Sequence, residues 1–403
     1  MHLGMLLDHR FPGDNRVERE AAALLEAGHR VTIVGFKTGV DRPGFGYRTE
    51  RVDLRQHGCP EIPGLKGLYK FVAAYFLLVS AGRRLGLEAL HCHDLPLMAP
   101  ALVAAKKLKL PLVFDCHENY PGLVRSWGRM RNLKGRLWAA YEGWAAARAT
   151  AVLTVVQEMR DRLSSDGSDK SKFLILPNSL DPRVWDGFGI DQEIVDRYQG
   201  RRVLTYSGTY GRHKGVHLTV EALALIKDRF PDLLLVILAD SEDPLREKLE
   251  ARVGQLGLES QVEIAGWQPF ERLPSFYRAS FAGLIPQAPS IQTEHSWPNK
   301  LNEIAISGSP VAAADNRSLK RLVEENGLGL TFKAGDHRDL AGKLAWLLDH
   351  PAKAAEMGRR GEAWARGAGS WTCHKQVLID LYARLTLRSY DPVGPHPAPG
   401  RET

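Results

Sequence analysis

Several classes of protein are excluded by what this 403-residue sequence lacks. Its four cysteines, Cys59, Cys92, Cys116 and Cys373, have the spacing of neither a disulfide framework nor a paired zinc motif. We therefore expect a reducing compartment, the cytoplasm. The longest apolar run, residues 71–79, is less than half the length of a membrane-spanning helix. Because an acidic residue also interrupts the amino terminus early, the sequence predicts neither a secretory leader nor a membrane span.

Charge of neither sign dominates the chain. Its 54 Lys and Arg against 47 Asp and Glu give a net charge of +7, and the 25% of charged residues is the average for a globular protein. The basic residues are less densely clustered than in a dedicated nucleic-acid-binding protein, so we expect no nucleic-acid partner. Phosphate-bearing small molecules and acidic lipids remain open as partners.

Short apolar runs alternate with longer amphipathic stretches along the whole chain. RVTIVG, PLVFDC and TAVLTVV are expected strands of a first half, and the rhythm restarts with RRVLTYSG after residue 200. This alternation favours parallel strands joined by crossover helices. We therefore expect an α/β fold with two Rossmann-like, doubly wound domains that face each other across a cleft.

The boundary between the two halves is expected in 181–200, which is rich in turn-forming residues. We predict an N-terminal domain over 1–185 and a C-terminal domain over 186–370. A helix over 371–387 and a disordered tail rich in Pro and Gly over 388–403 complete the chain.

Loops that follow the expected strands are the places to look for a site, since ligands bind beyond the carboxyl ends of strands in such sheets. Two of these loops carry a mixture of imidazoles and carboxylates: His91, His93, Asp94, His117 and Glu118. We expect His91 and His93 to point to opposite faces of their strand, and no further cluster supplies ligands at a usual metal spacing. The prediction is a polar rim without a metal, in which His117 can donate to a substrate near neutral pH.

The segment SGTYGRHKG, residues 207–215, has the residues of an anion site. Its glycines allow close approach of the backbone, and Arg212 and Lys214 bring positive charge to the start of an expected helix. A diphosphate fits such a place. Further along, Pro298 stands where a helix is expected to start, and Glu303 lies in the apolar stretch NEIAISGSPVAAA that follows. Glu303 is either a solvated helix carboxylate or a buried functional one, and we favour the second because of its apolar surroundings.

Taken together, these segments resemble a known family. YSGTYGRHKGVHLTVEAL, VEIAGWQP, SWPNKLNEIAISGSPVAAADN and GLGLTF, with HCHD and DCHENYP upstream, are similar to GT-B glycosyltransferases of the retaining family 4 over about residues 1–387. The resemblance implies a transferase that binds a UDP- or GDP-linked sugar chiefly through its C-terminal domain. It further implies a glycan, lipid-linked or small-molecule acceptor on the N-terminal domain and retention of anomeric configuration. Because the loops hold no clustered carboxylate ligands and Lys214 and Arg212 can offset the charge of the leaving diphosphate, we expect no metal or other cofactor. The helix over 371–387 would cross back to the N-terminal domain.

The resemblance also assigns roles to residues of this chain. Lys214 falls on the family's diphosphate lysine, and Glu303 falls on the second glutamate of a pair, which holds the ribose hydroxyls. His117 falls on the histidine near the transferred sugar, and Gly13 lies in a loop that approaches the diphosphate.

Two positions depart from the family pattern. His295 stands at the place of the first glutamate of the pair, with Glu294 one residue out of register. Thr209 replaces an arginine, for which Arg212 is a candidate substitute. The predicted catalytic residues are His117, Lys214 and Arg212; the donor-binding residues are Gly13, Gly208, Arg212, Lys214, His295, Asn299, Lys300 and Glu303; the acceptor-binding residues are Asp14, His93, Asp94 and Glu118.

Two other functions stay open, because a fold does not determine a function. One is a sugar-nucleotide epimerase or phosphorylase of the same architecture, which an acceptor requirement would distinguish from a transferase. The other is a non-catalytic subunit that binds a sugar nucleotide.

One further segment, residues 125–148, interleaves basic residues with Trp127, Trp138 and Trp144. This pattern suits peripheral contact with an anionic membrane at its inner face, or an acidic glycolipid acceptor. The alternative is an amphipathic helix with a solvated basic face.

Overall fold

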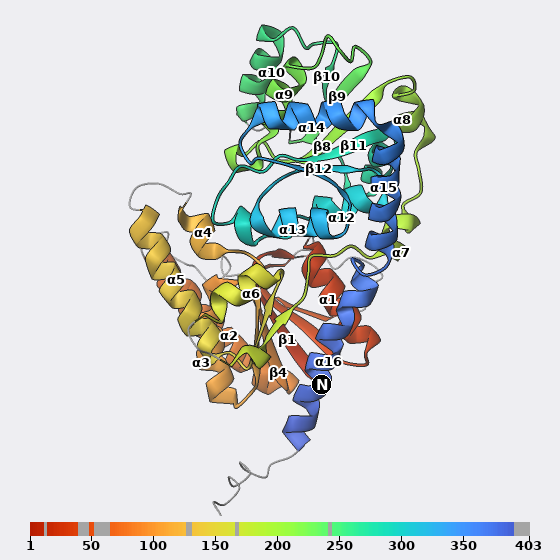
Figure 1. Cartoon of the computed structure of the whole chain (residues 1–403). Helices are drawn as coiled ribbons and strands as arrows, with labels where there is room; N and C mark the ends of the chain where they lie inside the picture. The colour runs from red at the N-terminus through yellow and green to blue at the C-terminus, as the bar shows by residue number, and fades with distance from the viewer. Residues whose placement is uncertain are drawn as a thin grey trace, which may run out of the picture. The chain divides into compact units, whose positions relative to one another are not determined.

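The computed structural model describes residues 1–11, 14–38, 48–51, 65–125, 131–165, 169–240 and 244–390 (Figure 1). Two parallel sheets, with helices between most of the successive strands, account for most of these residues. The α/β class with two Rossmann-like layers is therefore confirmed. No helix in the described ranges is long and apolar enough to cross a bilayer.

The first sheet contains the strands of the amino-terminal half. These are β1 (His2–Phe11), β2 (Arg30–Thr38), β3 (Arg48–Arg51), β4 (Ala89–His93), β5 (Leu112–Cys116), β6 (Ala151–Thr154) and β7 (Phe173–Ile175). The helices along this stretch are α1 (Asn15–Glu26), α2 (Leu65–Leu85), α3 (Met98–Leu108), α4 (Tyr120–Arg125), α5 (Arg131–Arg148) and α6 (Gln157–Leu163). The strand order is β3-β2-β1-β4-β5-β6-β7, so the order reverses between β1 and β4.

The second sheet begins after two short helices, α7 (Pro182–Gly187) and α8 (Gln192–Arg197). Its strands are β8 (Arg202–Gly208), β9 (Leu233–Ala239), β10 (Val262–Ile264), β11 (Ser280–Ile285), β12 (Val311–Ala314) and β13 (Gly329–Phe332). The helices along the rest of the chain are α9 (Val216–Ala224), α10 (Leu245–Gln255), α11 (Leu273–Arg278), α12 (Asn299–Ile306), α13 (Arg317–Glu325), α14 (His337–Asp349), α15 (Pro351–Arg366) and α16 (Trp371–Tyr390). The order β10-β9-β8-β11-β12-β13 is that of a dinucleotide-binding sheet, with its reversal between β8 and β11.

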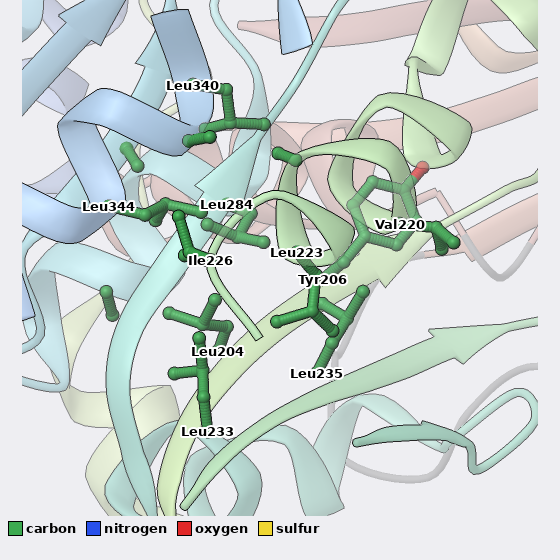
Figure 2. Close-up of a cluster of buried hydrophobic side chains, with 14 of the residues drawn as sticks. Leu204, Tyr206, Val220, Leu223, Ile226, Leu233, Leu235, Leu284, Leu340 and Leu344 are labelled. Carbon is green, nitrogen blue, oxygen red and sulfur yellow. The ribbon is translucent and has the colours of Figure 1, made fainter. Parts of the chain in front are cut away.

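Apolar side chains of this second sheet are buried under its helices. Every residue of β9 is buried, as expected for a central parallel strand covered on both faces. Figure 2 shows Leu204 and Leu235 of the sheet together with Val220 and Leu223 of α9 and Leu344 of α14. Burying one such leucine stabilises the fold by about 1.5 to 3 kcal/mol, so this cluster fixes α9 and α14 against the strands.

The chain divides into two compact units that do not follow sequence order. One comprises Met1–Asp115, Ala145–Val152 and Lys375–Thr403, and the other comprises Cys116–Trp144 and Leu153–His374. The predicted boundaries at 185 and 370 therefore stay predictions.

The terminal helix α16 is longer than the sequence predicted. It continues to Tyr390 rather than ending at 387, because no helix-breaking residue occurs before Pro392. Within the first unit, Lys375 of this helix pairs with Glu26, and the Tyr382 hydroxyl lies 2.9 Å from Nδ1 of His91. The rest of the predicted disordered tail lies outside the described residues.

Candidate functional site

A cavity of about 470 Å³ lies at the carboxyl ends of β8 and β11, within the second unit. The strand order of the second sheet reverses between β8 and β11. The size of the cavity is typical of a small-molecule site. The loop after β8, the loop after β11 and the first turns of α12 line it, together with residues 117–119. Of the predicted residues, it brings together His117, Glu118, Gly208, Lys214, His295, Asn299, Lys300 and Glu303.

Glycines let the loop after β8 form one wall of the cavity. Gly208 has a φ of +146°, and a Cβ there would lie 2.5 Å from Nζ of Lys300. Gly215 has a φ of +72°, and a Cβ there would overlap the carbonyl oxygen of Pro286 in the loop after β11. Ala288 N also donates to the His213 carbonyl oxygen at 3.0 Å. The two loops are therefore in contact, and only glycine fits at both positions.

Lys300, in the first turn of α12, brings a cation to the end of β8. Its Nζ donates to the backbone carbonyl of Ser207 and lies 4.6 Å from the ring centroid of Tyr206. Burial and the neighbouring Lys214 lower the pKa of Lys300 to about 7, against the opposing effect of Glu303. Burial lowers the pKa of His213 too, and Lys214 and Lys300 lower it further. This wall therefore gathers basic nitrogens whose positive charge an anionic ligand would stabilise.

Glu303, one turn after Lys300, is buried: only 9% of its surface is exposed. Glu303 is thus buried, as expected, rather than a solvated helix carboxylate, and its functional role stays a prediction. Burial raises the pKa of the Tyr277 hydroxyl, and the charge of Glu303 raises it further. Pro298 precedes the first residue of α12, as expected of a proline at a helix start.

A second wall is made by residues 117–119 together with Gln292, Thr293 and His295. Asn119 Nδ2 donates to the Ile291 carbonyl at 2.9 Å, and Gln292 Nε2 donates to a Glu118 carboxylate oxygen at 3.1 Å. His295 Nδ1 lies 2.9 Å from the same Ile291 carbonyl. Its neighbour Glu294 does not line the cavity, because its carboxylate accepts from the backbone N–H of Arg317 at 2.8 Å and so caps α13.

An apolar wall of the cavity was missed by the sequence reasoning. Leu238, Trp267, Phe270 and Leu273 line it beside the polar Gln268, most of them from the segment after β10. Trp267 is 66% exposed although it is a large aromatic side chain. Trp267 lies three residues after the end of β10, and because ligands bind beyond the carboxyl ends of such strands, its place in the sequence was the available signal.

Asp14, His93 and Asp94 lie in the other unit, and two further predicted residues lie wholly or partly outside the part of the chain that the structure describes. Asp14 caps α1, its side chain accepting from the N–H groups of Arg16 and Val17. Asp94 has a positive φ of 63° at the end of β4. Gly13 lies outside the described residues, and so does the side chain of Arg212.

The prediction that His91 and His93 point to opposite faces of their strand is wrong. Their rings stack with centroids 4.4 Å apart, because side chains two residues apart lie on the same face of a strand. His93 Nδ1 lies 3.0 Å from Asp115 Oδ2, and His93 is fully buried rather than lining the cavity.

The claim that no further metal ligands gather there is wrong as well. Glu20 and Asp115 join the two histidines in a buried group whose ligand atoms all lie within 4.8 Å of one another. Arg16 donates to both Asp115 oxygens at 2.6 and 2.8 Å and lies 2.9 Å from Glu20. Because this guanidinium already supplies the positive charge that a cation would bring, the absence of a metal stays our prediction.

Two family models match the chain in succession. Residues 13–179 match the glycosyl transferase 4-like domain, and residues 189–364 match glycosyl transferases group 1. The 2-deoxystreptamine glucosyltransferase of Streptomyces kanamyceticus is 25% identical over 372 residues, which is 87% of this chain and 92% of that protein.

Solved structures share the fold. The sucrose-phosphate synthase of Thermosynechococcus elongatus superposes with a TM-score of 0.79 at 18% identity, over 96% of this chain and all of that chain. Anabaena HepE in complex with UDP-glucose gives a TM-score of 0.71 at 17% identity, over 95% of this chain and all of that chain.

Proposed function

The chain belongs to the GT-B glycosyltransferases, and from this premise we propose that its 470 Å³ cavity binds a nucleoside-diphosphate sugar whose sugar is transferred with retention. The observation that carries the proposal is the wall after β8, where Lys214 and Lys300 face one cavity. Sugar transfer from a diphosphate leaves negative charge on the leaving group. Preorganised cations stabilise that charge as it develops.

The neighbouring walls fit the other parts of such a donor. Glu303 is a buried acceptor beside the cations, and in our proposal it accepts from the ribose hydroxyls. The apolar wall with Leu238 and Phe270 is suited to the base. Gly208 leaves room for the diphosphate next to the backbone, and Asn299 adds a polar side chain at the start of α12.

His117 and Glu118 line the same cavity and are proposed to act at the transferred sugar and the acceptor. An imidazole that donates to a sugar hydroxyl contributes most while positive charge builds at the anomeric carbon. Glu118 is proposed to accept from the acceptor's hydroxyl. Asp14, His93 and Asp94 belong to the other unit, and their acceptor role stays a prediction.

No metal is required in this proposal, because lysines face the place where the leaving diphosphate forms. Activity that EDTA abolishes and magnesium or manganese restores would contradict this.

The surface of α5 suits the proposed peripheral contact with the inner, cytoplasmic face of a membrane. Leu133, Leu137 and Trp144 are 48%, 63% and 39% exposed, and at about 100° per residue they lie within roughly 40° of one another around the helix. Exposed Lys134 and Arg136 flank this stripe on its two sides. An apolar stripe between cations is typical of a helix that lies on an anionic bilayer.

The experiment that tests the proposed function is acceptor-dependent release of nucleoside diphosphate. The wild type is incubated with UDP-, GDP-, ADP- and dTDP-glucose, each with and without a mixture of aminocyclitol, inositol phosphate and hexose phosphate acceptors. Release that requires an acceptor supports a transferase. Conversion of the sugar nucleotide without an acceptor supports the epimerase alternative, and tight binding without any turnover supports the non-catalytic subunit.

A further inference from the structure

A second cavity, of about 370 Å³, lies in the same unit as the 470 Å³ cavity, and the two have no lining residue in common. Residues of α7, α11 and α15 line it, together with the end of α12, which packs against α15 (Figure 1). Its volume lies within the range of small-molecule sites. The function proposed above does not use this cavity.

One side of the second cavity is apolar. Trp185, Pro274 and Ile306 line it and are buried. Ile190, also in the lining, is 50% exposed. Because covering exposed apolar surface is favourable, this side stabilises an apolar group of a ligand.

Arg278, at the end of α11, brings a cation to the cavity. Its side chain is exposed, and it has no ion pair or hydrogen bond with any other residue in the described ranges. Its N–H donors are therefore available to a ligand. A planar guanidinium of this kind matches the geometry of a carboxylate and binds it with two parallel hydrogen bonds.

The cavity also has an acidic side. Arg366 lies 2.8 Å from the Asp186 carboxylate and 3.1 Å from that of Glu362, and all three residues line the cavity. Two carboxylates against one guanidinium leave an excess of negative charge there. The carboxyl end of α12, at Ile306 and Ser307, adds a partial negative charge. An ammonium group of a ligand is stabilised by these charges.

An amino acid with an apolar side chain carries the complement of all three features. We propose that the 370 Å³ cavity binds such an amino acid, with its carboxylate on Arg278 and its ammonium group facing Asp186 and Glu362. The apolar side chain then covers Ile190 beside Trp185. This site is separate from the nucleotide site and does not depend on the function proposed for it.

The occupant of this cavity acts as an effector of nucleotide binding, because the two cavities share structural elements. The ring centroid of Trp185 lies 5.8 Å from that of Phe270, which lines the 470 Å³ cavity. The Ser307 hydroxyl donates at 2.9 Å to the carbonyl oxygen of Glu303, one turn earlier on α12. An amino acid that fixes Trp185 and the end of α12 therefore changes the free energy of binding at the other cavity. This effector role rests on the proposed function.

Calorimetry with small probes tests the proposal. Phenylalanine and leucine are titrated into the wild type, with 3-phenylpropionate and 2-phenylethylamine as analogues that lack the ammonium and the carboxylate. Arg278→Met and Glu362→Gln each remove one charge from the cavity. Arg338→Met, at an exposed position of α14, is the matched control, and Lys214→Ala tests whether a probe occupies the 470 Å³ cavity instead. The Tm of each variant verifies that it folds.

We expect phenylalanine or leucine to bind the wild type, and both analogues to bind about 3-fold or more weakly. Arg278→Met and Glu362→Gln should each weaken amino acid binding by about 3- to 10-fold, the effect of one lost contact of a partly exposed charge. Arg338→Met and Lys214→Ala should bind the amino acid as the wild type does. A saturating amino acid should change the affinity for the nucleoside diphosphate by about 5-fold or more, and the nucleotide should change the affinity for the amino acid by the same factor.

The proposed site is overturned if neither amino acid binds, if the analogues bind as tightly, or if Arg278→Met leaves the binding unchanged. Loss of amino acid binding in Lys214→Ala would place the probe in the other cavity and would overturn it as well. Amino acid binding that leaves nucleotide affinity unchanged overturns only the effector role. Binding of none of UDP, GDP, ADP and dTDP removes the proposed function and the effector role with it, whereas amino acid binding that Arg278→Met weakens still supports the site.

Discussion

Replacing Lys300 with methionine should stabilise the fold while weakening the binding of a diphosphate. The substitution keeps an unbranched side chain of similar length over the Tyr206 ring and removes the amine that contacts Ser207. An ammonium group held beside Lys214 costs free energy in the unliganded protein. The same group becomes favourable when an anion binds.

The size of this effect follows from the pKa of Lys300, which falls from 10.5 to about 7. A change of one in the pKa corresponds to about 1.4 kcal/mol, so burial destabilises the charged form of Lys300 by at most about 5 kcal/mol. We expect about 2 kcal/mol, because the side chain is partly exposed and the variant loses its hydrogen bond and ring contact.

The pH dependence has a definite sign. Below about pH 7 the lysine is charged in both the folded and the unfolded chain, so the whole cost of burying the charge is present. Between about pH 7 and 10.5 the folded protein has lost the proton that the unfolded chain retains, and the wild type gains stability as the pH rises. The advantage of Lys300→Met should therefore be largest at pH 6 and shrink toward pH 10.

Urea unfolding of wild type and Lys300→Met from pH 6 to 10 measures this difference, with calorimetry of inorganic pyrophosphate at pH 6 as the binding assay. Lys248→Met, at an exposed position of α10, is the matched control and should change neither quantity. The binding loss should be about 10- to 100-fold, as for a charged hydrogen bond. A variant less stable than the wild type at pH 6, or a stability gain that is constant with pH, would refute the reasoning.

Three further predictions concern other parts of the account. Glu303→Gln should weaken nucleoside diphosphate binding by about 1.5 to 3 kcal/mol in calorimetry and leave inorganic pyrophosphate binding largely unchanged, since the carboxylate is proposed to contact ribose rather than phosphate; equal losses for both ligands would contradict this. His117→Ala should lower kcat of sugar transfer and leave nucleotide affinity nearly intact, and activity lost only in proportion to a lowered Tm would indicate a structural role instead. The wild type should sediment with anionic but not with neutral vesicles at low salt, and Leu137→Glu on α5 should reduce this binding. Equal binding of the wild type to anionic and neutral vesicles would indicate that α5 is an ordinary solvated helix.

The architecture was predictable because alternation of apolar runs and amphipathic stretches is a local signal. β9 is apolar at every position, and the start of α12 at Pro298 is encoded in neighbouring residues. The burial of Glu303 was predictable for the same reason, since the apolar residues around it determine the face of the helix.

Contacts between residues far apart in sequence were not predictable. Lys300 reaches a carbonyl 93 positions earlier, and Arg16 joins Asp115 across 99 positions. No periodicity encodes such pairs, because they depend on which strands become neighbours. The stacking of His91 on His93, by contrast, could have been predicted from the sequence, because side chains two residues apart lie on the same face of a strand. We missed it because we assigned the two side chains to opposite faces.

The most direct test of the account is calorimetric titration of UDP, GDP, ADP and dTDP into wild type, Lys214→Ala and the exposed-site control Lys248→Ala. If the cavity after β8 is a nucleoside-diphosphate site, at least one of the four binds the wild type, and Lys214→Ala weakens that binding about 10-fold or more as one charged contact is lost. The control should bind like the wild type. No binding by the wild type, or binding that Lys214→Ala leaves unchanged, would contradict the account.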